Sequence, residues 1–163
     1  MREITVFGRN YRVVARESEE ESVELRDGLL LLETGGKSED FLMKEFLSGL
    51  LYRQLLEIFE ELKRKGGIEI YGNIDFEVVD RIDRNPKRVA KLEGNKIFVK
   101  INVVFLPLRV VEYIVAHEMA HLFVKRHTKR FWKIVERLHP DYKTSHNLLL
   151  QNLHLIEKPL FGR

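Results

Sequence analysis

The segment His117-Glu118-Met119-Ala120-His121 constrains this chain more than any other part of its sequence. It continues an apolar run that starts near Arg109, and such a run predicts a helix. In a helix, side chains four residues apart lie on one face, so His117 and His121 can direct two imidazoles at the same ion. Glu118 is expected to turn away from that axis and still reach a water bound to the ion. The segment therefore predicts a helix that carries part of a metal site.

Two neutral histidines beside a carboxylate are typical of zinc peptidases, in which the glutamate is the general base and not a ligand. Catalytic zinc normally has a third protein ligand, and His127 is the candidate. The alternative is a buried helix with two satisfied histidines, but an ionised Glu118 in an apolar helix needs a partner. We therefore predict one Zn²⁺ per chain, held by His117, His121 and His127, with Glu118 as the catalytic residue.

Composition narrows the class of protein. The chain has 163 residues, of which 44% are hydrophobic and 33% are charged, as expected for one globular domain over residues 1–163. No apolar run approaches the ~20 residues that span a bilayer, and the first residues lack the apolar segment of a signal peptide. Cysteine is absent, which excludes disulfides and thiolate ligands. These features predict a cytoplasmic protein without membrane contact.

Charge is unevenly distributed along the chain. Residues 1–80 hold 11 basic and 18 acidic side chains, whereas residues 81–163 hold 17 basic and 7 acidic ones. A basic half favours acidic partners, nucleic acid included. The alternative, which we favour, is that the two halves pair with each other. We therefore expect weak, non-specific nucleic-acid contact at most.

Short apolar runs separated by turn residues predict strands in the first part of the chain. Gly8-Arg9-Asn10 and Asp27-Gly28 are turn signals of the kind that joins hairpin strands. We predict an N-terminal antiparallel β meander over residues 1–36, with strands at residues 4–7, 11–15, 22–26 and 29–33.

Residues 38–65 predict one long helix. Ser38 is a suitable N-cap, acids occupy the first turn, apolar residues recur at helical spacing, and Gly66-Gly67 end the helix. Beyond it we predict a small antiparallel sheet with strands at residues 68–71, 76–79, 89–92 and 96–103. The last of these strands alternates between apolar and polar residues and directly precedes the metal helix. It could form a wall of the cleft and bind an extended peptide by strand addition.

The metal helix, which Pro107 opens, cannot run straight to His127. A continuous helix would place a residue ten positions on about 15 Å along the axis. The chain must therefore turn near Lys125-Arg126. Thr128 is then a suitable N-cap for a helix that ends at Pro140, and residues 144–156 predict a last helix. Residues 68–163 thus form the metal-site region of an α+β fold.

Three motifs resemble a known family. The chain resembles the YgjP-like predicted metallopeptidases, which are compact zincins related to SprT-like and Wss1-like (WLM) proteases. The resemblance rests on the segments 117–121, His127-Thr128-Lys129-Arg130-Phe131-Trp132 and Pro140-Asp141-Tyr142. The resemblance covers about residues 97–142. It implies a zincin-like fold, metal ligation by His117, His121 and His127, and Glu118 as the base. Asn102 also fits a family position.

Several other residues are candidates for supporting roles. We expect His139 to lie at a helix end and His154 to be packed. A donor to the oxyanion of the transition state could come from Tyr142 or His146. The second ring N–H of a ligand histidine needs an acceptor, for which the sequence offers Glu112, Glu136 and Asp141 without choosing among them.

We therefore predict a zinc-dependent metallopeptidase that hydrolyses peptide or protein substrates. One alternative is a nucleic-acid-associated protein, either a DNA-linked protease of the SprT or Wss1 type or a DNA-binding module with a vestigial metal site. Another is a structural zinc protein, which would require a fourth protein ligand.

Overall fold

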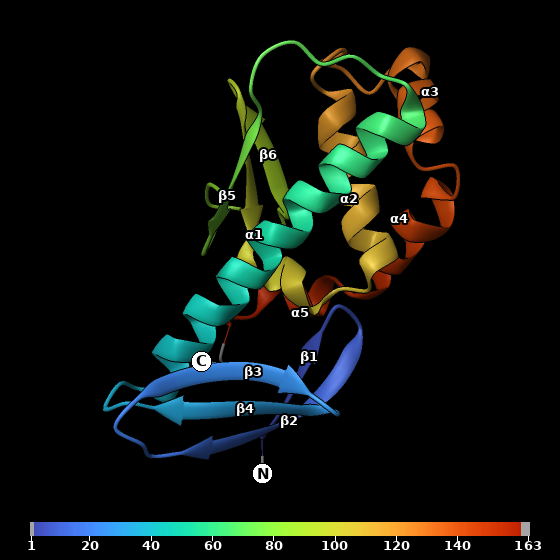
Figure 1. Ribbon diagram of the computed structural model, residues 1–163. Coiled ribbons are helices and arrows are strands. Elements are labelled where there is room, and N and C mark those ends of the chain that lie inside the picture. Colours follow the sequence, from blue (N-terminus) through green and yellow to red (C-terminus); the bar gives the residue numbers. More distant parts are fainter. Residues whose placement is uncertain (1, 161–163) are drawn as a thin grey trace.

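The computed structural model describes residues 2–160 and confirms the α+β class (Figure 1). Four N-terminal strands form a sheet at one end of the molecule, and the long helix α1 (Glu39–Gly66) runs from them alongside a second, smaller sheet. Four further α-helices and one short 3-10 helix complete the described part. None of the helices between residues 2 and 160 has the length and apolar character needed to cross a bilayer.

The first sheet contains both predicted hairpins, but it is not a meander. Its strands are β1 (Arg2–Val6), β2 (Arg9–Arg16), β3 (Glu21–Arg26) and β4 (Leu29–Thr34), in the order β1-β2-β4-β3. β4 pairs antiparallel with β3 and parallel with β2. Leu30 and Leu32 of β4 are almost fully buried, in a cluster with Leu42 and Met43 of α1. β4 therefore takes an inner position, and the charged strand β3 lies at the edge.

Helix α1 has the ends that the sequence predicts. The Ser38 hydroxyl accepts a hydrogen bond from the Phe41 N–H, and Gly67 ends the helix in a left-handed conformation with a φ of 58°. A stripe that includes Leu47, Leu51 and Leu55 is wholly buried in the main core. Helix α1 thereby joins the first sheet to the rest of the molecule.

The second sheet is mixed rather than antiparallel. It has the order β5-β7-β6, formed by β5 (Asp75–Val79), β6 (Ala90–Glu93) and β7 (Lys96–Lys100). β5 and β7 are parallel, and β6 pairs antiparallel with β7. The predicted strand at 68–71 does not form, and the one predicted at 96–103 ends at Lys100, where the short helix η1 (Ile101–Phe105) begins.

The position of β7 corrects a prediction about the cleft. Ile97 and Val99 are wholly buried, and β7 pairs with a strand on each side. A strand with two neighbours has no free edge, so β7 cannot add a peptide. The edge strand that contacts the metal helix is β6 instead.

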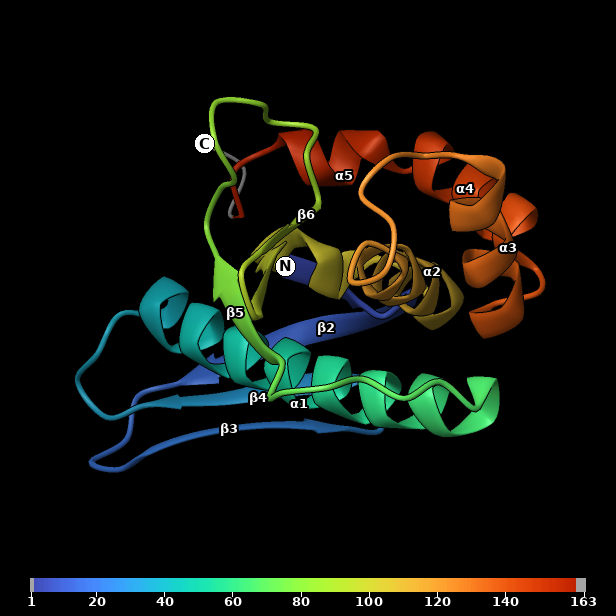
Figure 2. The ribbon, with the colours of Figure 1, turned by 90° about the horizontal axis from the view of Figure 1, so that it is seen from above.

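The metal helix is α2 (Leu108–Ala120), which follows Pro107 as predicted. Seen from above, it lies between α1 on one side and α4 (Tyr142–Gln151) on the other, with α3 (Lys129–Leu138) beside it (Figure 2). The predicted last helix is in fact two, α4 and α5 (Leu153–Glu157), separated at Asn152. The Asn152 side chain donates to the Leu148 carbonyl, a local bond of the kind that competes with helix continuation.

Two polar side chains hold the C-terminal segment to the core. The Lys100 ammonium group, which is buried, donates to the carbonyls of Pro86 and Ile156. The Asn102 amide donates to the carbonyls of Leu155 and Lys158. Burial lowers the pKa of Lys100. Asn102, the family position noted in the sequence, thus holds the segment from Leu155 to Lys158.

Candidate metal centre

The three histidines come together because α2 ends immediately before the second of them, His121. The last helical residue is Ala120, and the N–H groups of Leu122 and Val124 bond to the carbonyls of Met119 and Ala120. The chain then bends at residues 125 and 126, as predicted, and returns to His127 without a glycine. Ordinary turn hydrogen bonds are sufficient for this reversal.

The geometry of the three imidazoles suits a zinc ion. One ring nitrogen from each of His117, His121 and His127 lies within 4.8 Å of the others. The Nε2 atoms of His121 and His127 are 3.2 Å apart. Two Zn–N bonds of 2.0–2.1 Å at a tetrahedral angle give an N···N separation of about 3.3–3.4 Å. Within residues 2–160, this is the one group of histidine, cysteine or carboxylate side chains close enough to hold an ion.

Two aromatic residues pack against the histidine rings. Phe131, wholly buried on α3, has its ring centre 5.0, 4.5 and 4.8 Å from those of His117, His121 and His127. Trp132 is adjacent, with its ring centre 6.0 Å from that of His127. The packing restricts the rotation of the imidazoles, so they are oriented before an ion arrives.

The second nitrogen of His121 has a partner that the sequence did not suggest. Its Nδ1 lies 3.1 Å from the Val124 carbonyl, a contact that places the proton on Nδ1 and leaves Nε2 for a metal. The acids proposed for this role lie elsewhere: Glu112 is near His139, Asp141 pairs with Arg109, and Glu136 is exposed. A backbone carbonyl carries no side-chain signal, which is why sequence reasoning missed it.

Glu118 is a buried carboxylate in the same cleft. It is 5% exposed, and its Oε2 lies 3.1 Å from Nδ1 of His117, which gives the carboxylate the partner that its burial requires. His127 is the most exposed of the three histidines. Its pKa is lowered by partial desolvation first and by His117 and His121 next, so the neutral, metal-binding form is favoured.

A cleft of about 1240 Å³ contains the three histidines and Glu118. One side is formed by α2. Opposite it lie residues in and before β6, namely Val89, Ala90 and Leu92. Together with Ile114, these residues make this part of the cleft lining apolar.

A second polar pair lies in this cleft, one helical turn before His117. The Tyr113 hydroxyl is 2.9 Å from Nδ1 of His146, and both residues line the cleft. Burial raises the pKa of Tyr113 to about 12, so its O–H stays protonated. Of the two donors suggested by the sequence, His146 reaches the cleft, whereas Tyr142 stacks on Trp132. Tyr113 was missed, although its spacing of four from His117 places it on the same helix face.

The remaining histidines lie outside the centre. His139 ends α3, as predicted, and is buried with its Nε2 2.7 Å from the Ser145 hydroxyl. The prediction that His154 is packed is wrong, because it is exposed on α5. Its apolar neighbours in sequence suggested burial, but α5 is a short amphipathic helix that turns His154 outwards.

Residues 90–152 match the family model described as YgjP-like, metallopeptidase domain. The resemblance predicted from the motifs is thereby confirmed over this segment. The YgjP-like segment begins at β6 and ends just after α4, so it includes the three histidines and Glu118, whereas the cleft residues before β6 lie outside it. The first sheet and α1 lie outside it. In the same comparisons, no curated protein and no solved structure matches the chain.

Proposed function

We propose that this protein is a zinc-dependent peptidase in which His117, His121 and His127 hold one Zn²⁺ and Glu118 is the general base. The observation that carries the proposal is the convergence of three imidazole nitrogens beside a buried carboxylate in an open cleft. The YgjP-like metallopeptidase domain over residues 90–152 supports the same conclusion. A structural zinc site would need a fourth protein ligand, and residues 2–160 offer three.

The bound zinc would polarise the scissile carbonyl and acidify the attacking water. Glu118 takes the proton of that water as it attacks the carbonyl carbon, and then transfers it to the leaving nitrogen. Tyr113 and His146 lie in the same cleft and can donate hydrogen bonds to the carbonyl oxygen as its negative charge grows.

We further propose that the substrate backbone lies along β6. This strand is at the edge of its sheet and contributes to the cleft wall. An extended peptide can pair with an edge strand through main-chain hydrogen bonds, which bind many sequences with similar affinity. Placed there, alternate carbonyl groups of the peptide would bond to β6 and the others would point away from this strand.

The first prediction separates metal binding from catalysis. Glu118→Gln preserves the shape and hydrogen bonding of the side chain but removes the base, so zinc content and Tm should match the wild type. Hydrolysis of casein should fall by a factor on the order of 10² or more. His127→Ala is the matched metal variant and should lose zinc as well as activity. A Glu118→Gln protein that holds zinc and cleaves at the wild-type rate would refute the mechanism.

A second candidate function is contact with nucleic acid near the metal centre. Five basic side chains are exposed around the third histidine, and none of them has an ion pair within residues 2–160. They are Lys125, Arg126, Lys129, Arg130 and Lys133. Among the described residues, most ion pairs join residues of the same half, as Lys87 and Glu157 do, so pairing between the halves does not neutralise this surface.

Our second prediction concerns this surface. Binding to duplex DNA should be weak, should not depend on base sequence, and should fall steeply between about 50 and 200 mM salt because it rests on counterion release. Fluorescence anisotropy with two unrelated duplexes measures both properties. Tight binding that survives high salt, without peptide cleavage, would favour a DNA-binding module instead.

A further inference from the structure

The charged side chains that line the cleft are almost all positive. Lys87, Arg88 and Lys125 contribute to its lining, and the acid among the lining residues is Glu118, which is buried beside the histidines. The remaining polar side chains there are neutral or are the histidines themselves. A substrate side chain in this cleft therefore meets cations rather than acids.

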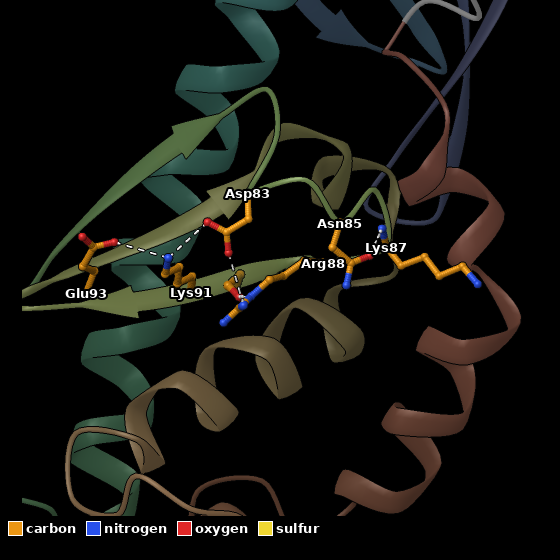
Figure 3. A network of polar contacts seen from close by, with 7 residues as sticks. Asp83, Asn85, Lys87, Arg88, Lys91 and Glu93 are labelled. Atoms are coloured by element: carbon orange, nitrogen blue, oxygen red, sulfur yellow. Dashed lines mark hydrogen bonds and ion pairs between the residues drawn. The ribbon is translucent and has the colours of Figure 1, made fainter.

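Arg88 differs from the other two cations because its guanidinium is held in place. Its Nε donates to the Ala90 carbonyl at 3.3 Å, and its Nη1 lies 3.4 Å from the Asp83 carboxylate (Figure 3). Figure 3 also shows Lys87 directed away from Arg88, and its Nζ lies 3.8 Å from Glu157. Lys125 is exposed and has no such contact among the described residues, so the fold does not hold its charge in place.

The loop that carries Arg88 is itself anchored. A turn closes between the Asn85 carbonyl and the Arg88 N–H at 3.1 Å, and the Asn85 side chain accepts from the Lys87 N–H. The Pro86 carbonyl in the middle of this turn receives the buried Lys100 ammonium group. The position of Arg88 is therefore fixed by the fold before any ligand binds, which reduces the entropy lost on binding.

The contacts of Arg88 leave some of its N–H groups free to donate further hydrogen bonds. A guanidinium has five N–H groups, and these two contacts use two of them. Asp83 does not fully neutralise the charge of Arg88, because the same carboxylate also pairs with Lys91 at 3.2 Å. The side chain remains 44% exposed. Its free N–H groups are thus available for a planar anion, and a carboxylate is the peptide group that fits this fork.

We propose that Arg88 forms a carboxylate-binding subsite, so that the substrates are peptides with a carboxylate close to the scissile bond. This inference rests on the proposed peptidase function and names its substrate class. The carboxylate can come from an aspartate or glutamate side chain or from the C-terminus of the peptide. Arg88 lies two residues before β6, so a peptide paired with that edge strand passes directly by it. A nucleic-acid strand has no corresponding pairing with a strand edge, which is why a peptide is favoured.

Binding to the inactive Glu118→Gln protein tests the subsite without cleavage. Short fluorescent peptides share one sequence and carry either Glu or Gln at each of several positions, with a free or an amidated C-terminus. The preferred carboxylate should strengthen binding about tenfold, a modest gain for a charged hydrogen bond at a half-exposed site. The position at which Glu matters, or the loss caused by amidation, identifies which source of carboxylate is used.

Variants in the same background assign the effect to Arg88. Arg88→Gln should bind Glu and Gln peptides equally, whereas Arg88→Lys should keep a reduced preference because it retains the charge without the fork. Arg84→Gln is the matched control, since Arg84 is exposed in the same loop but does not line the cleft, and it should keep the full preference. Equal binding of all peptides, or no binding, overturns the subsite. So does a single-stranded oligonucleotide that displaces the peptide and itself requires Arg88.

The two proposals fail in different ways. If the wild type cleaves Gln and Glu peptides equally and Glu118→Gln abolishes both, the peptidase function stands and the subsite is wrong. If no peptide is cleaved but the Glu preference depends on Arg88, the subsite stands and the peptidase function is wrong.

Discussion

Tyr113 joins the metal helix α2 to α4 through its contact with His146. Tyr113 lies one helical turn before the first histidine, on the same face of α2. Because its pKa is about 12, it remains a donor throughout the pH range in which a peptidase with neutral histidines can work. The group is therefore suited to stabilising the charge that develops on the substrate carbonyl.

Our third prediction tests this role. Tyr113→Phe removes the O–H and keeps the ring, so kcat should fall by a factor on the order of 10² while KM and zinc content stay near wild type. Tyr142→Phe is the control, because that residue stacks on Trp132 and does not line the cleft. An unchanged kcat in Tyr113→Phe, with only a lower Tm, would make the hydroxyl structural.

The sequence predicted the residues whose spacing alone determines their geometry. His117 and His121 follow from the helical repeat, and His127 follows from the need for a third ligand. Tyr113 and Arg88 could not be assigned in this way. Arg88 belongs to a loop whose position depends on contacts with Lys100, twelve residues further along the chain, and Tyr113 has a role only because α4 brings His146 to it.

At the level of elements, the start of α3 has two functions. The Thr128 hydroxyl caps the helix by accepting from the Phe131 N–H, and the residue before it is the third histidine. Capping therefore fixes both the direction of α3 and the approach of His127 to the other imidazoles.

Our fourth prediction compares two N-caps. Thr128→Ala and Ser38→Ala each remove a capping oxygen and should each lower the free energy of unfolding by about 1 kcal/mol. Only Thr128→Ala should also weaken zinc binding, by about tenfold, the lower end of the range for residues behind a metal ligand. Competition with a zinc-chelating dye measures the affinity. Equal zinc affinities in the two variants would show that the cap does not position His127.

Helix ends could be predicted because their signals are local, as at Ser38, Gly67 and Thr128. The order of the strands within the sheets could not be predicted in this way. Turn residues identify which neighbouring strands form hairpins, but the parallel pairs β2–β4 and β5–β7 join strands that are not consecutive. These pairings arise because β4 and β7 carry the most completely buried side chains among the strands, and burial depends on the whole fold.

At the scale of the molecule, we propose that residues 1–163 form one domain, because the main core takes side chains from Val6 in β1 to Ile156 in α5. Residues 1 and 161–163 of that predicted domain lie outside the described residues. The stability of such a core should depend on pH through His139. Burial is the main cause that lowers its pKa from 6.5, Arg109 adds to this, and Glu112 and Asp141 oppose it.

Our fifth prediction follows from this shift. The folded protein binds the His139 proton less readily than the unfolded chain does. The contribution of His139 is therefore fully present above about pH 6.5 and is lost as the pH falls through the lower, folded pKa. Urea unfolding of metal-free protein at about pH 8 and about pH 5 should show a smaller acid-induced loss of stability in His139→Gln than in the wild type. His154→Gln, which alters an exposed histidine, should behave as the wild type does.

The Lys100 ammonium group is shared between the turn at Pro86 and the carbonyl of Ile156 in the last helix. One proton-bearing group thus couples the rim of the cleft to a segment 70 residues further along the chain. An affinity tag or a truncation that disturbs α5 would therefore alter which ligands the cleft selects while leaving the histidines undisturbed. When preparations of this protein differ only in a C-terminal extension, their selectivity among peptide ligands should be compared before their rates of hydrolysis are.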